Sequence, residues 1–276
     1  MTRLADLARL VRAPAALTVP GDVLAGAAAA GRLLDRRVVA QSAASVCLYW
    51  AGMALNDYVD RRLDAEERPE RPIPSGAVSP GTALGVATGL TVAGLGLSAL
   101  AGGGAVALPL AALVWAYDVA LKSTPTGPVA MGAARAVNVL TGATGDLRRG
   151  LPAAVLVGAH TVSVTRLSRH EVSGADRAVP ASALAVTGVV GVMAGLVRRP
   201  LAALLAAGYV AACGRAQLSA LGDPAAGVVR RAVAAGIHGL IPLQAALIAR
   251  AGSPAAAPVA AVFPLARWLG RRVSPT

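Results

Sequence analysis

Charged residues are scarce in this 276-residue chain: only 14% of its residues are Asp, Glu, Lys or Arg, whereas 55% are hydrophobic. A soluble domain usually carries roughly 25% charged residues. A chain of this length therefore has too few charges to cover a water-facing surface. The composition excludes an ordinary soluble domain and indicates a protein that lives in lipid.

Cysteine, histidine and aromatic residues are also scarce. Cys47 and Cys213 each lie within an apolar stretch, and the three histidines are scattered along the chain. These numbers exclude a disulfide framework and a metal site built from Cys and His. With only 3% aromatic residues, a thick aromatic belt at the membrane interface is not expected either.

What charge the chain does have is strongly positive, with a net charge of +12. In a soluble protein, such a balance would suggest a nucleic-acid partner. Here the basic residues stand mostly between apolar runs, where anchors at the membrane surface belong. We therefore expect the lipid bilayer, and not nucleic acid, as the surrounding partner. No obligate protein partner is evident from the sequence.

Long apolar runs dominate the sequence, and each is close to the length of about 20 residues that a membrane-spanning helix needs. The alternation typical of a β-barrel is absent. We predict an all-α fold, a polytopic membrane bundle of about nine transmembrane helices around a central cavity with a polar mouth, forming a single domain over residues 1–276. The predicted spans are 14–31, 38–57, 80–100, 104–122, 128–145, 150–168, 180–197, 200–216 and 232–250.

Two further patterns concern packing and orientation. Glycine pairs such as Gly85–Gly89 and Gly142–Gly145 predict places where membrane helices approach closely. Basic residues are slightly more numerous in the loops on the side of the N-terminus, which predicts that this side is cytoplasmic. A tenth apolar stretch, 254–270, contains three prolines and is expected to lie along the interface or to pack as a tail.

The acidic residues are concentrated at one place: six of the 14 fall between residues 57 and 70. Asn56, Asp60 and Asp64 are spaced four residues apart, so on a helix they form one stripe of oxygen atoms at the end of the second span. Such a stripe suits Mg²⁺, which prefers carboxylates, water and substrate phosphates. The alternative is that these acids are solvated interface charges paired with Arg61 and Arg62.

The segment that begins Asn56-Asp57-Tyr58-Val59-Asp60 and reaches Asp64 resembles the first aspartate-rich motif of the UbiA superfamily of intramembrane prenyltransferases. The loop that follows, Glu67 to Gly76, is similar to the corresponding loop of that family. Two later segments also resemble family motifs: Tyr117 to Lys122, and Arg135 to Asn138.

The resemblance implies a transferase that ionises an isoprenoid diphosphate and passes the prenyl group to a small acceptor. It implies Mg²⁺ held by Asn56, Asp60 and Asp64, which would neutralise the leaving diphosphate. It further implies a multi-pass membrane enzyme, here expected in a bacterial plasma membrane with the mouth of its active site on the cytoplasmic side. The remaining residues it assigns to catalysis or substrate binding in this part of the chain are Asp57, Lys122, Arg68, Arg71, Tyr117, Arg135 and Asn138. Arg135, alone within a span, is expected either to contact the diphosphate or to be a structural partner of a helix carbonyl.

The sequence departs from the family pattern at the second acidic motif, between residues 164 and 176. Glu171 and Asp176 are the only acids there, and Arg166 and Arg169 stand where carboxylates are expected. We therefore expect at most one metal site, with both arginines and Glu171 as substrate ligands. This altered motif is similar to that of the EboC-like branch.

Two other functions remain possible on the sequence alone. A non-catalytic protein on the same scaffold would bind or help export a prenylated lipid. An unrelated transporter would show inverted repeats and a path of charges across the membrane, and the sequence has neither feature.

Overall fold

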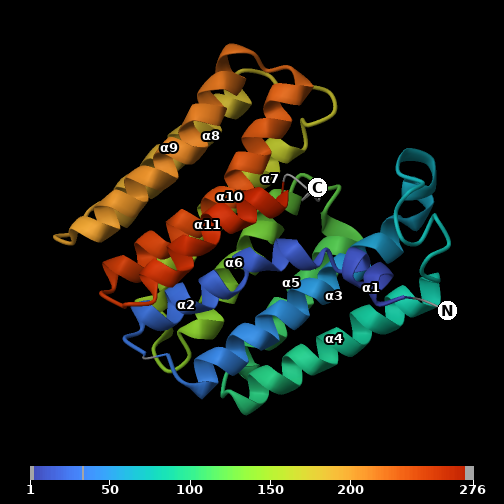
Figure 1. Ribbon diagram of the computed structural model, residues 1–276, viewed down its shortest axis with the longest axis horizontal. Helices are drawn as coiled ribbons and strands as arrows, with labels where there is room; N and C mark the ends of the chain where they lie inside the picture. The colour runs from blue at the N-terminus through green and yellow to red at the C-terminus, as the bar shows by residue number, and fades with distance from the viewer. Residues whose placement is uncertain (1–2, 33, 271–276) are drawn as a thin grey trace.

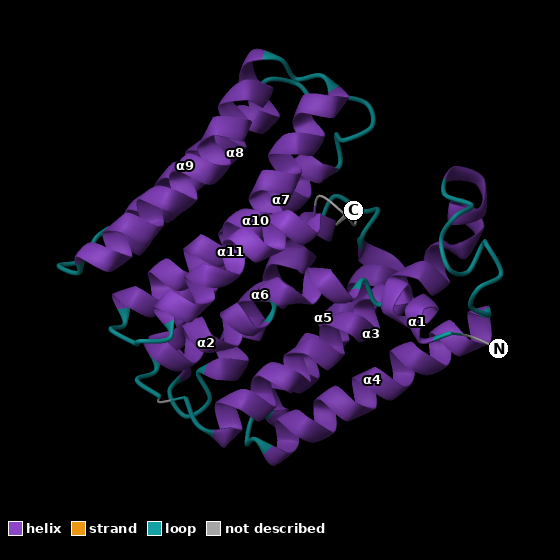
Figure 2. Ribbon diagram, in the orientation of Figure 1, coloured by secondary structure: helices purple, strands orange, loops and turns teal. Residues whose placement is uncertain are grey.

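Every regular element in the computed structural model is a helix, and the structure describes residues 3–32 and 34–270 (Figures 1 and 2). The first half of the chain forms α1 (Leu4–Leu10), η1 (Ala13–Thr18), α2 (Pro20–Ala29), α3 (Arg36–Glu67), α4 (Pro80–Leu100), α5 (Gly104–Ala116) and η2 (Tyr117–Leu121). The second half forms α6 (Gly127–Gly142), α7 (Leu147–Ser168), α8 (Ala178–Gly195), α9 (Pro200–Gly222), α10 (Ala226–Arg250) and α11 (Ala256–Gly270).

The predicted all-α membrane bundle is confirmed, and each of the nine predicted spans coincides with a helix or with a pair of consecutive helices. Within the described ranges, six helices are long and apolar enough to cross a membrane: α3, α4, α5 with η2, α8, α9 and α10. The first predicted span, 14–31, is a shorter apolar helical segment, Ala16–Ala29. The count of nine is therefore approximate. The 254–270 stretch forms α11, which packs on α10 and η1.

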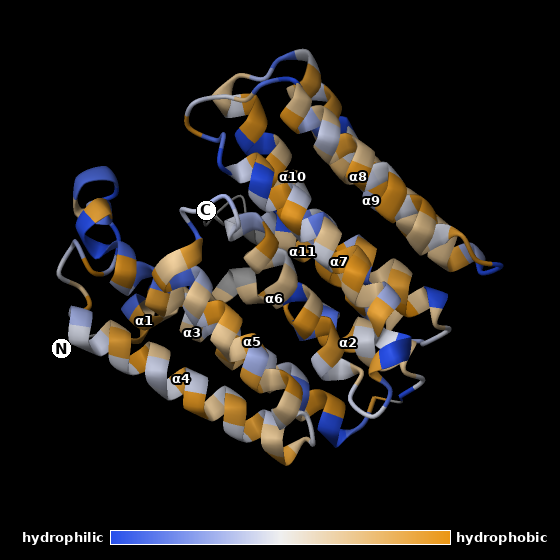
Figure 3. Cartoon of the chain, turned by 180° about the vertical axis from the view of Figure 1, so that it is seen from behind, coloured by the Kyte–Doolittle hydropathy of each residue, from blue (hydrophilic) through white to orange (hydrophobic). Residues whose placement is uncertain are grey.

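Helix boundaries follow local chemistry. Asp35, Ser79 and Asp146 each accept a hydrogen bond from a backbone N–H in the first turn of α3, α4 and α7. Such caps satisfy donors that a helix start leaves unpaired. The chain reverses at each connection, and the most extensive helix contacts are those of α3 with α4, α6 with α7 and α9 with α10. Hydrophobic residues run along α4 and α9, and hydrophilic residues gather at helix ends and between α3 and α4 (Figure 3).

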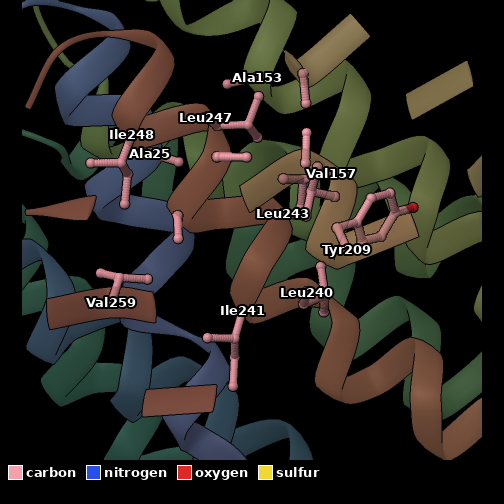
Figure 4. Close-up of a cluster of buried hydrophobic side chains, with 14 of the residues drawn as sticks. Ala25, Ala153, Val157, Tyr209, Leu240, Ile241, Leu243, Leu247, Ile248 and Val259 are labelled. Atoms are coloured by element: carbon pink, nitrogen blue, oxygen red, sulfur yellow. The ribbon is translucent and has the colours of Figure 1, made fainter. Parts of the chain in front are cut away.

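The core is centred on α10, whose residues from Gly239 to Ala249 are all buried. Leu243, Leu247 and Ile248 from this helix pack among side chains of α2, α7 and α9, including Val157 and Tyr209 (Figure 4). A membrane helix that is buried along most of its length cannot face lipid. Helix α10 is therefore the central helix of the bundle, and the other helices pack around it.

Glycine allows close contact at one of the two predicted places. A Cβ at Gly142 would collide with the backbone carbonyl of Val23, and a Cβ at Gly26 would collide with that of Val139, so α2 and α6 cross with their backbones in contact. Gly85 and Gly89 face open space, and the prediction of close packing at this pair is wrong. Gly145 is a turn residue with φ +102° and does not pack at the crossing.

Because the chain reverses at each connection, the loops 68–79, 122–126, 169–177 and 223–225 share one end of the bundle. Contacts join three of these loops: Ala175 donates its N–H to the carbonyl of Pro224, and the Arg169 guanidinium donates to the carbonyls of Lys122 and Thr124. The acidic end of α3 lies at this same end. The polar mouth predicted for the bundle is therefore here.

Candidate active site

A cavity of about 490 Å³ opens at this end of the bundle, between α3, η2, α6, α7 and α10. Side chains of all five elements line it, so the site draws on residues far apart in the sequence. The structure brings eight of the predicted site residues to its wall: Asn56, Asp60, Asp64, Arg68, Arg71, Tyr117, Arg135 and Glu171.

The oxygen stripe predicted on α3 forms one wall of this cavity. Asp60 pairs with Lys122, whose Nζ lies 2.6 Å from its carboxylate, and Asp64 pairs with Arg71 at 2.7 Å. Asn56 donates its side-chain N–H to Asp118 at 3.2 Å. Each member of the stripe therefore has a partner from another segment. The charges of the two carboxylates are balanced by the basic side chains of Lys122 and Arg71.

The alternative pairing with Arg61 and Arg62 is not what the structure describes. The Arg61 guanidinium donates to the carbonyl of Tyr58 and lies over the Tyr58 ring, 4.5 Å from its centroid. Arg62 is exposed and forms no described ion pair. The acids of the stripe are therefore cavity residues, and solvated surface pairing does not explain them.

Asp57 lies apart from the stripe, although its neighbour Asn56 lines the cavity. It is 3% exposed, and its carboxylate accepts from Arg12 at 3.2 Å and lies 3.5 Å from Arg71. Asp57 is not among the residues that line the cavity. The geometry indicates a structural role for Asp57. Through Arg12 and Arg71 it holds the segment after α1 and the loop after α3 against the end of α3.

Below the mouth, the cavity adjoins a smaller apolar pocket of about 90 Å³ between α3, α5 and α6. Tyr49, Met53, Tyr117, Met131 and Arg135 line both spaces. A polar mouth that leads into an apolar pocket suits a molecule with a charged head and a hydrocarbon tail.

Arg135 and Asn138 belong to a buried network around Asp22. Asp22 is fully buried, and its carboxylate lies 3.0 Å from Arg135, 2.9 Å from the Asn138 amide and 2.6 Å from the Gln244 amide. This pairing neutralises Arg135 inside the protein. The predicted contact of Arg135 with diphosphate thus competes with a partner already in place. Sequence reasoning missed Asp22, although an acid within the first apolar run was visible.

Asp118 is a second site residue that the sequence reasoning missed. It lies on η2, a single π-helical stretch that continues α5, and it lines both the cavity and the apolar pocket. Such π-helical insertions are frequent at functional sites. Its signal in the sequence was an acid beside Tyr117 inside an apolar run, since acids at membrane depth are costly and mark functional positions.

The wall opposite the stripe comes from α7, the following loop and α10. Glu171 lines it with one carboxylate oxygen that is buried and has no hydrogen-bond partner, and burial raises the pKa of Glu171 above its usual range, against the attraction of Arg230 and Arg68. His160 also faces the cavity, with Nδ1 2.8 Å from the Tyr209 hydroxyl and Nε2 3.0 Å from the Gly236 carbonyl.

The two arginines predicted to replace the second acidic motif do not reach this cavity. Arg166 is exposed on α7 and is not part of the lining. Arg169 is also exposed, and it binds the carbonyls of the loop after η2. The geometry therefore provides no support for their predicted contact with diphosphate. Arg68, which is half-buried in the cavity wall without a described ion pair, is better placed for that contact.

The donors of the stripe suit a hard cation such as Mg²⁺. Asn56, Asp60, Asp64 and Asp118 offer oxygen atoms to one cavity. Among the residues that the structure describes, no group of three acids, histidines or cysteines forms a ready metal cage. Mg²⁺ commonly binds through one or two carboxylates together with substrate phosphates. The residues present fit that mode of binding.

These features define a class: a multi-pass membrane helix bundle whose polar cavity, lined by acids and bases, opens at one end and leads to an apolar pocket. The chain belongs to the UbiA prenyltransferase family, whose family model matches residues 18–178. The matched region contains the stripe, both later motifs and the altered segment after α7.

Individual relatives agree with this assignment. The chain is 37% identical over 124 residues to the digeranylgeranylglyceryl phosphate synthase of Methanopyrus kandleri, and 39% identical over 129 residues to that of Natronomonas pharaonis. These matches cover 44% and 45% of this chain and 44% and 46% of the relatives, so the chain spans less than half the length of the curated relatives it matches. The structure of a UbiA homologue from Aeropyrum pernix K1 shares the fold, with a TM-score of 0.67 at 18% identity over 85% of this chain and 97% of that one.

Proposed function

We propose that the chain is an intramembrane prenyltransferase that moves a prenyl group from an isoprenoid diphosphate to a small acceptor. The observation that carries this proposal is the pairing of two cavity carboxylates with two basic side chains, Asp60 with Lys122 and Asp64 with Arg71. The family membership and the apolar pocket below these pairs support the same conclusion.

In the proposed reaction, the bond between C1 of the prenyl chain and the diphosphate oxygen breaks, and the electron pair leaves with diphosphate. A new bond then forms between C1 and the acceptor, which gives up its proton. Mg²⁺ bound by Asn56, Asp60 and Asp64 would supply positive charge to the leaving group. Lys122, Arg68 and Arg71 supply further positive charge from the chain itself.

The remaining residues of the site hold the substrates and keep water out. The apolar pocket, lined by residues such as Leu48, Val114 and Met131, accommodates part of the prenyl tail and excludes water from the allylic cation. Tyr117 lies where the two spaces meet, beside the position expected for C1. Asp118 lies at the same junction and is the carboxylate best placed to face the acceptor.

We further propose that the protein lies in a bacterial plasma membrane with this mouth on the cytoplasmic side. The slightly larger number of basic residues in the loops at this end supports that orientation. The curated relatives are named for a glycerol phosphate product. A glycerol phosphate is therefore the first acceptor to test.

The test is diphosphate release from geranylgeranyl diphosphate by the purified protein in lipid nanodiscs, with and without Mg²⁺, over a panel of acceptors. Release should require both Mg²⁺ and one acceptor. Asp60→Asn or Asp64→Asn should lower the rate at least about 100-fold, as expected for loss of a charge-stabilising group. Exposed Glu66 on the same helix provides the matched control, because Glu66→Gln should leave the rate unchanged.

Undiminished turnover in either Asp variant would contradict this mechanism. Binding of the diphosphate without release across the whole panel would instead favour the alternative, a non-catalytic prenyl-lipid binding or export-assisting protein.

A further inference from the structure

A second polar pocket lies on the outside of the bundle, between α9, α10 and α11. It has a volume of about 660 Å³. Its polar lining consists of three arginines and one histidine: Arg215, Arg231, Arg267 and His238. No residue of the proposed active site contributes to it, so its charge serves some other purpose.

None of the three arginines has an acidic partner in the described part of the chain. Arg215 donates only to the carbonyl of Ala211 on its own helix, and the Arg267 guanidinium lies 5.6 Å from the centroid of the Phe263 ring. Arg231 is exposed and forms no described ion pair. No Asp or Glu lines the pocket. The pocket therefore concentrates positive charge that the described residues do not neutralise.

The rest of the pocket lining is apolar: Ala212, Ala234, Ala235 and Phe263. Elsewhere on the helices that form the pocket, Leu218 on α9 and Leu265 and Trp268 on α11 are each about half exposed. In a membrane bundle, exposed apolar side chains of this kind face lipid. Isolated arginines on a lipid-facing surface are costly and require an anion or access to the membrane surface.

The depth of the pocket matches the headgroup region. With a rise of about 1.5 Å per residue, Arg231 lies roughly 8 Å from the start of α10, and Arg215 roughly 10 Å from the end of α9. The long arginine side chains can extend from this depth to the level of lipid phosphates. These ends of α9 and α10 are at the same end of the bundle as the active-site mouth, next to loop 223–225.

We infer that this pocket binds the phosphate group of an anionic membrane phospholipid. Arg215, Arg231 and Arg267 converge on it from three helices and provide the planar donor pairs that bind phosphate oxygens bidentately. The acyl chains would lie along the exposed apolar surface of α9 and α11. Bound in this way, the lipid joins α11 to α9 and α10. The inference does not depend on the proposed enzymatic activity.

The test measures phosphatidylglycerol binding to the purified full chain by native mass spectrometry, with phosphatidylcholine as the neutral reference. The triple variant Arg215→Gln, Arg231→Gln, Arg267→Gln should lower the affinity for phosphatidylglycerol at least about tenfold. The matched control is the triple variant Arg36→Gln, Arg148→Gln, Arg198→Gln, which removes three exposed arginines from the opposite end of the bundle. The control should change the affinity less than about twofold.

Equal affinities of the two triple variants would overturn the inference, because lipid binding would then follow net charge alone. Competition by millimolar inorganic phosphate or diphosphate at this pocket would also overturn it, because the ligand would then be a soluble anion. Prenyl transfer in phosphatidylcholine nanodiscs should be the same for wild type and both variants, which separates this result from the outcome for the proposed function. If the pocket variant is too unstable to purify, the single variant Arg231→Gln should still lower the affinity measurably.

Discussion

Several buried carboxylates of this protein lie in ion pairs, and the pair of Asp22 with Arg135 is the most enclosed of those described. Asp22 is fully buried, and Thr18, Asn138 and Gln244 complete the network around the pair. Removing one member of a buried pair costs more than the pair itself contributes, because the other charge is left without compensation. This network therefore determines how α2, α6 and α10 fit together.

Asp22→Ala should accordingly lower the free energy of unfolding by about 3 to 5 kcal/mol, the cost typical of breaking a buried ion pair. The double variant Asp22→Leu, Arg135→Met should recover part of this loss, since no buried charge remains. The measurement is thermal unfolding of the purified variants in one detergent. A double variant no more stable than Asp22→Ala would show that the charge of Arg135 is not the source of the loss.

Glu171 provides a prediction that depends on pH. Its pKa in the folded protein is raised from 4.5 by burial, so the folded state holds the proton more tightly than the unfolded state. The ionised carboxylate therefore destabilises the fold at pH values above its folded pKa. This penalty is relieved as the pH falls through that pKa toward 4.5.

Glu171→Gln should therefore be more stable than wild type at pH 8, and the difference should disappear near pH 4.5. Melting temperatures of both proteins across this range check the prediction. Glu66→Gln, at an exposed position, is the reference for the loss of one surface charge. A constant difference between Glu171→Gln and wild type at every pH would contradict the assignment.

At the scale of elements, the crossing of α2 and α6 is the contact that depends most on residue size. A Cβ at Gly26 would meet the carbonyl of Val139, whereas a Cβ at Gly89 on α4 would meet nothing within 4 Å. Both glycines lie within helices, where alanine is intrinsically favoured by about 1 kcal/mol. The same substitution should therefore have opposite effects at the two positions.

Gly26→Ala should destabilise the protein by about 1 to 3 kcal/mol, as overpacking does. Gly89→Ala should be neutral or slightly stabilising. The unfolding temperatures of both variants in the same detergent test this prediction. Equal effects would mean that α2 and α6 can move apart without loss of stability.

At the scale of the whole molecule, the bundle could be predicted because membrane helices follow the length and apolarity of single runs. The 80–100 run corresponds to α4 at both ends. The oxygen stripe was predictable for the same reason, since a spacing of four residues is a local property of α3.

The partners of the stripe could not be predicted, because they depend on contacts between distant segments. Lys122 and Asp60 are 62 residues apart, and Gln244 and Asp22 are 222 residues apart. Local spacing also could not show that Arg166 and Arg169 are absent from the cavity lining. The single-domain prediction for residues 1–276 stays a prediction, since its two ends lie outside the described residues.

The orientation of the whole chain is open to a direct test. Ser75 lies in the loop after α3, and Ser253 lies between α10 and α11 at the other end. In a background in which Cys47 and Cys213 are replaced by alanine, Ser75→Cys should react with a membrane-impermeant maleimide only after the cells are opened. Ser253→Cys should react in intact cells. The reverse pattern would place the active-site mouth outside.

The pairing of Asp60 with Lys122 and of Asp64 with Arg71 has a consequence for how the site fills. A divalent ion arriving alone would leave Lys122 or Arg71 without its counter-ion. When a diphosphate arrives at the same time, the displaced cations gain its oxygens as new partners. Each ligand therefore lowers the cost of admitting the other, and by thermodynamic linkage the effect is reciprocal. We expect the empty protein not to bind free magnesium at cellular concentrations and to bind the metal and the prenyl diphosphate together. The cavity then binds the complete substrate complex and neither component alone.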